Sequence, residues 1–191
     1  MTDVFHIRDR PIGNGHACYV IAEAGSNHNG SLEQALKLIE VAAQARADAV
    51  KFQTFKASKL YVPGAGTSDY LGDERSINDV IEAMEMPHAW LPILAEAAHD
   101  QGLAFMSTPF HEEAVDLLEG LVDAFKIASY EMSHHPLLRR VASTERPIIM
   151  STGAHGLAEV VAAVEVIRNA GCTDLALLQC TAAYPAPPSS P

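Results

Sequence analysis

Short apolar runs recur along the chain, and each ends in polar residues. Between them lie segments whose apolar residues recur every three or four positions, the spacing of one helix face. The segment 31–45 places Leu32, Leu36 and Ile39 on one stripe behind Ser31, a residue type that caps helices. The apolar runs with polar ends are 20–30, 49–54, 104–110, 125–131, 148–154 and 175–185. The pattern therefore predicts six consecutive strand–helix units.

Six such units in a row favour right-handed crossovers and a parallel sheet. Two architectures have this pattern, a doubly wound open sheet and a TIM-type (β/α)8 barrel. Neither a GxGxxG motif nor a phosphate-binding loop follows the first predicted strand, which weakens the nucleotide-binding, doubly wound alternative. Polar residues end every strand instead of gathering at one switch point, which favours the barrel. Because such a barrel has eight strands and about 250 residues, we expect residues 1–191 to form a single, incomplete barrel domain.

Two segments lie outside this repeat. Residues 4–17 alternate loosely around Gly-Asn-Gly and predict a β-hairpin, which could plug the amino-terminal end of the barrel. Residues 55–86 are rich in Gly, Ser and Asp, and they predict an irregular excursion at the rim with some local helix.

Composition narrows the class of protein. The 191 residues are 48% hydrophobic and 19% charged, as in a globular domain. The net charge of −11 should repel nucleic acid and anionic membranes, so an anionic substrate would need a locally basic pocket. No apolar run approaches the ~20 residues of a membrane span, and the start of the chain lacks an apolar signal core. We expect a soluble cytoplasmic protein whose three scattered cysteines are inert structural thiols.

Two lysines lie inside apolar strands. Lys51 in AVKF and Lys126 in AFKI are flanked on both sides by residues typical of a buried strand. A buried lysine needs an anionic partner, and a phosphate or carboxylate ligand would supply one. Two other readings stay open, an edge position where the ammonium reaches solvent and a Schiff-base role.

Hydroxyls and carboxylates occur at the ends of the same strands. Thr108, Ser129 and Ser151 offer hydroxyl groups at three successive strand ends. Together with two lysines they indicate an oxyanion or phosphate site. Glu23 and Glu131 are carboxylates at strand ends, each able to pair with a lysine or to orient water or a substrate hydroxyl.

These motifs together resemble those of the sialic acid synthase family, which includes the N-acetylneuraminate, pseudaminic acid and legionaminic acid synthases. The matching segments cover the chain from Ile7 to Pro187. They are IAEAGSNHNGSLEQA, DAVKFQTFKASKL, FMSTPF, FKIASYE with the following HPLL, RPIIMSTGA and LLQCTAAYP. The resemblance implies a TIM barrel, whose last strands and frequent antifreeze-like domain are absent here. It also implies condensation of phosphoenolpyruvate with an N-acetylated hexose such as N-acetylmannosamine, giving a nonulosonic acid and phosphate.

The resemblance further implies roles for the residues at the strand ends. Those expected to hold phosphoenolpyruvate are Lys51, Thr108, Lys126, Ser129 and Ser151. Catalysis would rest on the two lysines and on Glu23, which would act near the reacting carbons. Glu131 would bind the sugar, and Tyr184 would lie near the active site. A divalent metal, Mn²⁺ or Mg²⁺, would polarise the sugar aldehyde, but the histidines that bind it in the family lie on strands beyond this chain.

Three positions depart from the family pattern. Arg46 replaces a glycine, Tyr130 replaces the glycine before the expected sugar-binding glutamate, and Ala182 replaces an asparagine or serine. Because the family's metal ligands and two closing strands lie beyond this sequence, we expect the chain to lack full activity as a fragment. Because an open barrel exposes apolar strand edges, we also expect it to form homo-oligomers. Two alternatives stay open, a Schiff-base aldolase barrel and a non-catalytic barrel fragment that binds a phosphorylated ligand or a partner subunit.

Overall fold

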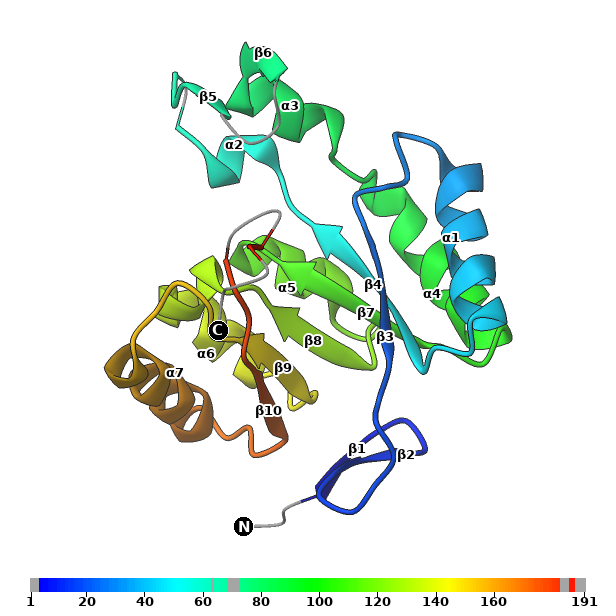
Figure 1. Cartoon of the computed structure of the whole chain (residues 1–191), viewed down its shortest axis with the longest axis vertical. Coiled ribbons are helices and arrows are strands. Elements are labelled where there is room, and N and C mark those ends of the chain that lie inside the picture. Colours follow the sequence, from blue (N-terminus) through cyan, green and yellow to red (C-terminus); the bar gives the residue numbers. More distant parts are fainter. Residues whose placement is uncertain (1–3, 63, 69–72, 183–185, 188–191) are drawn as a thin grey trace.

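The computed structural model describes residues 4–62, 64–68, 73–182 and 186–187. Its centre is a parallel sheet of six strands, which are β3 (Ile21–Gly25), β4 (Ala49–Thr54), β7 (Ala104–Pro109), β8 (Ala124–Ile127), β9 (Ile148–Ser151) and β10 (Leu175–Leu178). The strand order is β10-β9-β8-β7-β4-β3, so each strand lies beside its neighbours in sequence. Figure 1 shows this sheet curling into part of a barrel. The predicted incomplete TIM-type barrel is confirmed.

The connecting helices lie where the apolar stripes predict them. They are α1 (Leu32–Gln44), α4 (Leu91–Asp100), α5 (Glu112–Leu118), α6 (His135–Ala142) and α7 (Leu157–Asn169), with 3-10 turns η1 (His88–Trp90) and η2 (Tyr130–Ser133). The Ser31 hydroxyl accepts a hydrogen bond from the backbone N–H of Gln34 at 3.2 Å and so caps α1, as predicted. No helix in the described ranges is long and apolar enough to cross a bilayer.

The two faces of the sheet bury different side chains. Large residues such as Phe52, Phe105 and Phe125 pack against the helices in one core cluster. The inner face carries small residues such as Ala49 and Ala104, and the cluster built on it includes no helix residue in the described part of the chain. A doubly wound sheet would have helices on both faces, so this difference distinguishes the barrel from that alternative.

The N-terminal hairpin closes the amino end of the sheet, as predicted. It consists of β1 (Val4–Ile7) and β2 (Arg10–Gly13), paired antiparallel. Ile7 is 1% exposed and packs with the inner-face alanines at the amino ends of the strands. Asp48 accepts hydrogen bonds from the Val20 backbone N–H at 2.7 Å and from Arg10 of β2, which fixes the hairpin to the sheet. The hairpin lies at the bottom of Figure 1.

The excursion after β4 is more ordered than the sequence predicts. It contains the expected local helix, as α2 (Ala57–Leu60) and α3 (Ile77–Ala83). It also contains an antiparallel pair, β5 (Thr67–Ser68) and β6 (Asp73–Ser76), which the sequence analysis did not anticipate. Strands of two and four residues are too short to show an alternating pattern. In Figure 1 this excursion lies at the top, beyond the carboxyl end of β4.

Candidate active site

Strand alternation carries the polar residues into the barrel interior. Successive side chains of a strand point to opposite faces, so residues two apart share a face. Four strands each carry an inner-face apolar residue, which are Ala49, Met106, Ala124 and Ile149. Two positions further along the same strands lie, in the same order, Lys51, Thr108, Lys126 and Ser151. The inner face is therefore apolar toward the hairpin and polar toward the carboxyl ends. This is the end at which barrel enzymes bind their ligands.

Lys51 forms an ion pair inside the barrel. It lies on β4, is 9% exposed and pairs with the carboxylate of Glu23 on β3. The two residues are direct partners in the strand register. Because β4 lies between two other strands, the edge-lysine alternative does not apply to it. Pairing with a lysine is one of the two roles that the sequence suggests for Glu23. The Glu23 side chain is also half exposed, at the rim where a ligand would bind.

Lys126 on β8 is 8% exposed, and it too lies on an inner strand. Its ammonium donates hydrogen bonds to the Ser151 hydroxyl and to the Ile127 carbonyl, both at 2.7 Å. Within the described residues no carboxylate lies within ion-pair distance of it. Burial, reinforced by the positive charge of Lys51, lowers the pKa of Lys126 to about 8. Lys51 and Lys126 lie two positions beyond the inward-facing Ala49 and Ala124, so both lysines point to the inner face of the sheet.

Ser129 links the ends of three strands. Its hydroxyl lies 3.0 Å from the Cys180 sulfur and accepts a hydrogen bond from the Gly153 backbone N–H at 3.1 Å. The chain segments that follow β8, β9 and β10 thus meet at this hydroxyl. From the sequence Cys180 is expected to be structural, although it lies at the end of a predicted strand, the position that identified the other site residues.

Thr108 and Glu131 lie beside the lysines. Thr108 is buried on β7, the strand between those of the two lysines. Glu131 lies in η2, and its Oε2 atom is shielded from solvent without a hydrogen-bond partner among the described residues. Burial raises the pKa of this carboxyl group. Tyr184, the remaining predicted site residue, lies outside the described residues.

Two of the positions expected to depart from the family pattern, Tyr130 and Ala182, contact each other. The exposed Tyr130 side chain donates a hydrogen bond from its hydroxyl to the Ala182 backbone carbonyl at 3.4 Å. Both positions border the site, since Tyr130 precedes Glu131 and Ala182 follows Cys180 by two residues. Tyr130 and Ala182 therefore belong to the same part of the rim.

The described residues do not by themselves offer a site for a resident metal ion. In the described ranges, His, Cys, Asp and Glu side chains form no group of three or more that could hold one. Glu23 is already paired with Lys51. The described side chains therefore have roles in binding and proton handling, and none of them is assigned as a metal ligand.

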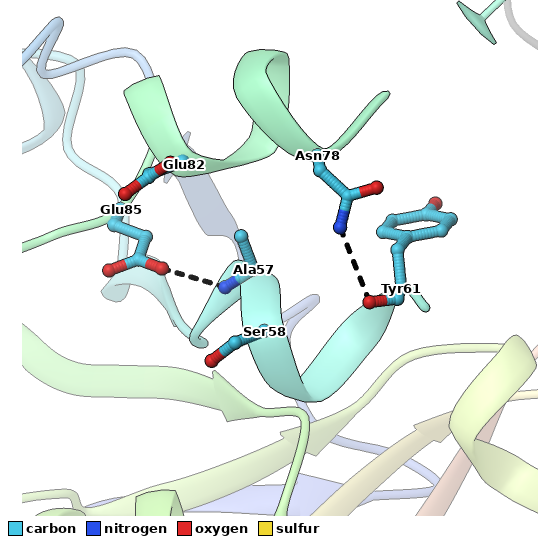
Figure 2. A pocket seen from close by; sticks show the side chains of 6 residues that line it. All are labelled: Ala57, Ser58, Tyr61, Asn78, Glu82 and Glu85. Carbon is cyan, nitrogen blue, oxygen red and sulfur yellow. Dashed lines mark hydrogen bonds between the residues drawn. The ribbon is translucent and has the colours of Figure 1, made fainter. Parts of the chain in front are cut away.

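A separate pocket lies in the excursion between α2 and α3. Figure 2 shows its lining residues, which are Ala57, Ser58, Tyr61, Asn78, Glu82 and Glu85. Its volume is about 220 Å³, and the Glu85 carboxylate in it accepts a hydrogen bond from the Ala57 backbone N–H at 2.7 Å. None of the predicted site residues line it, and its two glutamates make it unsuitable for a phosphate group.

Comparison with known proteins agrees with this geometry. The chain is 42% identical over 186 residues to the spore coat polysaccharide biosynthesis protein SpsE of Bacillus subtilis, covering 96% of this chain and 50% of that protein. The SpsE crystal structure superposes with a TM-score of 0.81. The N,N'-diacetyllegionaminic acid synthase of Legionella pneumophila is 38% identical over 186 residues, covering 93% of this chain and 52% of that protein.

A third similar protein is the N-acetylneuraminic acid (sialic acid) synthetase of Leptospira borgpetersenii, whose crystal structure contains citrate. It superposes with a TM-score of 0.85 at 26% identity, covering 97% of this chain and 61% of that one. The chain spans about half the length of the curated relatives it matches. Residues 38–190 match the model of the NeuB family. The predicted membership of the sialic acid synthase family is confirmed, and the chain belongs to the NeuB family.

Proposed function

We propose that this chain is a single barrel domain that supplies the phosphoenolpyruvate-binding part of a nonulosonic acid synthase. The reaction would condense phosphoenolpyruvate with an N-acetylated hexose and release phosphate, and it would take place in the cytoplasm. The observation that carries the proposal is Lys126, a buried ammonium that lacks a counter-ion among the described residues and donates a hydrogen bond to the Ser151 hydroxyl. Relatives named as acid synthases support the same reaction class.

The charge of phosphoenolpyruvate complements this arrangement. A buried ammonium without an anion loses its hydration and gains no compensating attraction. A phosphate or carboxylate group that contacts Lys126 would provide that attraction, and hydroxyls such as those of Ser151 and Thr108 can donate hydrogen bonds to its oxygens. Binding would therefore favour the charged form of Lys126 and stabilise the ammonium at this position.

The proposed chemistry places the remaining residues around the reacting carbons. C3 of phosphoenolpyruvate attacks the aldehyde carbon of the open-chain sugar, and positive charge develops at C2. Water adds to C2, and the tetrahedral intermediate loses phosphate by cleavage of its C–O bond. Glu23, half exposed at the rim, would orient that water. Glu131, whose Oε2 atom has no hydrogen-bond partner among the described residues, would hydrogen-bond a sugar hydroxyl.

The decisive experiment measures phosphoenolpyruvate binding by isothermal titration calorimetry. We expect Lys126→Met to weaken binding by about tenfold or more, because a charged hydrogen bond contributes roughly 1.5–3 kcal/mol. Lys37→Met is the matched control, since Lys37 is an exposed lysine of α1 paired with Glu40 at 2.7 Å. Equal affinities for wild type and Lys126→Met would overturn the assignment of the anion site.

A Schiff-base aldolase is the second candidate, and the lowered pKa of Lys126 favours it, because a larger fraction of the amine is then unprotonated. Borohydride reduction in the presence of pyruvate distinguishes the two. Mass addition at Lys126 would favour the aldolase. Binding of phosphoenolpyruvate to the chain, without any mass addition by pyruvate and borohydride, would favour the synthase.

We also propose that the chain self-associates. In the described sheet, β3 and β10 are the outermost strands, and Leu177 and Leu178 on β10 are exposed. Unpaired apolar edges promote association with another chain. Light scattering on the purified chain would give a mass above 20.5 kDa if this is correct, and a monomer at all concentrations would contradict it.

A further inference from the structure

The two strands that carry the lysines begin in the same way. Asp48 lies directly before β4 and Asp123 directly before β8, and each lysine follows its aspartate by three residues. The two segments read DAVKF (48–52) and DAFKI (123–127). Because a strand rises about 3.3 Å per residue, each aspartate lies roughly 10 Å from its lysine toward the amino end. Contact with a ligand at the rim therefore does not account for the shared aspartate.

Each aspartate exchanges two hydrogen bonds with one residue of the neighbouring chain segment. The Asp48 N–H donates to the Val20 carbonyl at 2.8 Å, and the Asp48 carboxylate accepts from the Val20 N–H at 2.7 Å. The Asp123 N–H donates to the Phe105 carbonyl at 2.9 Å, and the Asp123 carboxylate accepts from the Phe105 N–H at 2.8 Å. The same carboxylate oxygen of Asp123 lies 2.8 Å from Nε2 of His99 on α4. Each lysine-bearing strand is thus fixed to its neighbour at its amino end.

This connection holds a larger share of the pairing of β8 than of β4. Strand β4 pairs with β7 along its whole length, Ala49–Thr54, and with β3 on its other side. The register pairs between β8 and β7 cover Ala124 and Phe125 alone in the described sheet. Strand β8 also pairs with β9 over residues 125–127. The hydrogen bonds of Asp123 therefore extend a short pairing with β7, whereas those of Asp48 add to a long one.

The register of β8 decides where the Lys126 ammonium lies. Side chains of a strand alternate between faces, so a shift of one residue would turn Lys126 from the inner face toward the helices. In the observed register Lys126 reaches the Ser151 hydroxyl at 2.7 Å. Met106 pairs with Ala124, and two residues further along the same two strands Thr108 lies opposite Lys126. One register thus brings together three residues of the proposed anion site.

We propose that Asp123 is a positioning residue for the anion site, because it fixes the amino end of β8 against β7 and so sets the place of the Lys126 ammonium. The effect on the ligand rests on the proposed function, whereas the effect on Lys126 itself does not. Asp123 contacts no ligand in this role and acts only through its strand. Asp48 makes the same pair of hydrogen bonds, but its strand is also held along its length by β7.

Phosphoenolpyruvate affinity, measured by isothermal titration calorimetry, tests the effect on the ligand. Asp123→Ala should bind about fivefold more weakly or worse, since a charge-assisted hydrogen bond depends on its geometry. Asp123→Asn keeps an oxygen acceptor for the Phe105 N–H and should bind as wild type does. Asp48→Ala is the matched control, because it loses the same kind of hydrogen bond from a strand that keeps its other pairs, and it should bind nearly as wild type does. Equal affinities of Asp123→Ala and Asp48→Ala would overturn the proposal.

A second readout, on the lysine itself, separates positioning from a general loss of stability. The side-chain NMR resonances of Lys126, assigned with Lys126→Met, are titrated with pH in the chain without ligand. Burial lowers the pKa of Lys126 to about 8, and a strand held less firmly would let the ammonium reach water. The titration midpoint should therefore rise in Asp123→Ala and stay near the wild-type value in Asp123→Asn and Asp48→Ala. A midpoint that does not move in Asp123→Ala would refute the positioning role.

The two readouts keep this inference apart from the proposed function. A wild-type chain that does not bind phosphoenolpyruvate would overturn the proposed function, and a raised Lys126 midpoint in Asp123→Ala would still support the positioning role. Binding by wild type that is unchanged in Asp123→Ala would overturn the positioning role and leave the proposed function standing. If circular dichroism shows that Asp123→Ala does not fold, Asp123→Glu replaces it with the same expected results, because one more methylene group displaces the carboxylate from the Phe105 N–H.

Discussion

Replacing Gly153 with alanine should disturb the point where three strand ends meet. The added methyl group would lie 2.7 Å from the Cys180 sulfur, 2.8 Å from the Cys180 carbonyl oxygen and 3.1 Å from the Ser129 hydroxyl. The sulfur could rotate away, but the carbonyl belongs to the backbone and moves only with its chain segment. The φ angle of Gly153 is not in the left-handed region, so the expected effect comes from contact alone. Overpacking of this kind costs about 1–3 kcal/mol.

Gly156→Ala is the matched control for this substitution. Gly156 is the N-cap of α7, has φ −85°, and its closest neighbour to an added methyl group is the Glu159 carboxylate at 3.7 Å. Because alanine is a poorer N-cap than glycine, its replacement should lower the free energy of unfolding by about 0.5–1 kcal/mol. Urea unfolding followed by circular dichroism measures both variants, with equal urea slopes as the check on two-state behaviour. The reasoning is refuted if Gly153→Ala is as stable as Gly156→Ala and binds phosphoenolpyruvate as wild type does.

Three further outcomes follow from single contacts. The proposed anion site needs the protonated form of Lys126, whose pKa is about 8. Phosphoenolpyruvate affinity, measured by calorimetry, should therefore be steady between pH 7 and 7.5 and fall as the pH rises through 8. An affinity that does not change up to pH 9.5 would contradict this. Asp48→Ala should lower the free energy of unfolding by about 1–2 kcal/mol, since the Val20 N–H loses its charged acceptor, and an unchanged urea midpoint would count against it. Thr54→Val should cost about 1–3 kcal/mol by leaving the buried Ser107 hydroxyl, 2.9 Å away, without its partner; a Thr54→Val/Ser107→Ala double variant should recover most of that loss in the same urea assay.

The repeat of strands and helices could be predicted because its signals are local. Each helix shows a one-sided apolar stripe, and each strand is a continuous apolar run. Both faces of a barrel strand are buried, so apolar and polar positions do not alternate along it. The apolar runs therefore do not show which residues face the barrel interior. The division between faces follows size instead, with Ala49 and Ala124 on the inner face and Phe52 and Phe125 against the helices. Hydropathy alone does not reveal that division.

The candidate site could be predicted only as a set of strand ends. Ligands bind at the carboxyl ends of parallel strands, so residues at those ends are candidates for the site. This rule does not predict which of the candidates contact each other. The contact between Ser129 and Cys180, 51 residues apart, depends on the register of β8, β9 and β10 and on Gly153. Cysteine is most often a buried apolar residue, so its residue type argued against a role in chemistry. Its contact with the Ser129 hydroxyl is a property of the fold, and the residue type alone does not predict it.

The two lysines look equivalent in sequence but differ in charge balance. Lys51 has a carboxylate partner in Glu23, so that pair carries little net charge toward the interior. Lys126 has none in the described chain, and an arriving anion would gain most of its attraction there. If the anion also contacts Lys51, it must compete with Glu23, because one buried ammonium cannot fully neutralise two anions. In the proposed reaction that competition would release the Glu23 carboxylate only once phosphoenolpyruvate is in place. The group that orients water would then become available when there is a carbon for the water to attack.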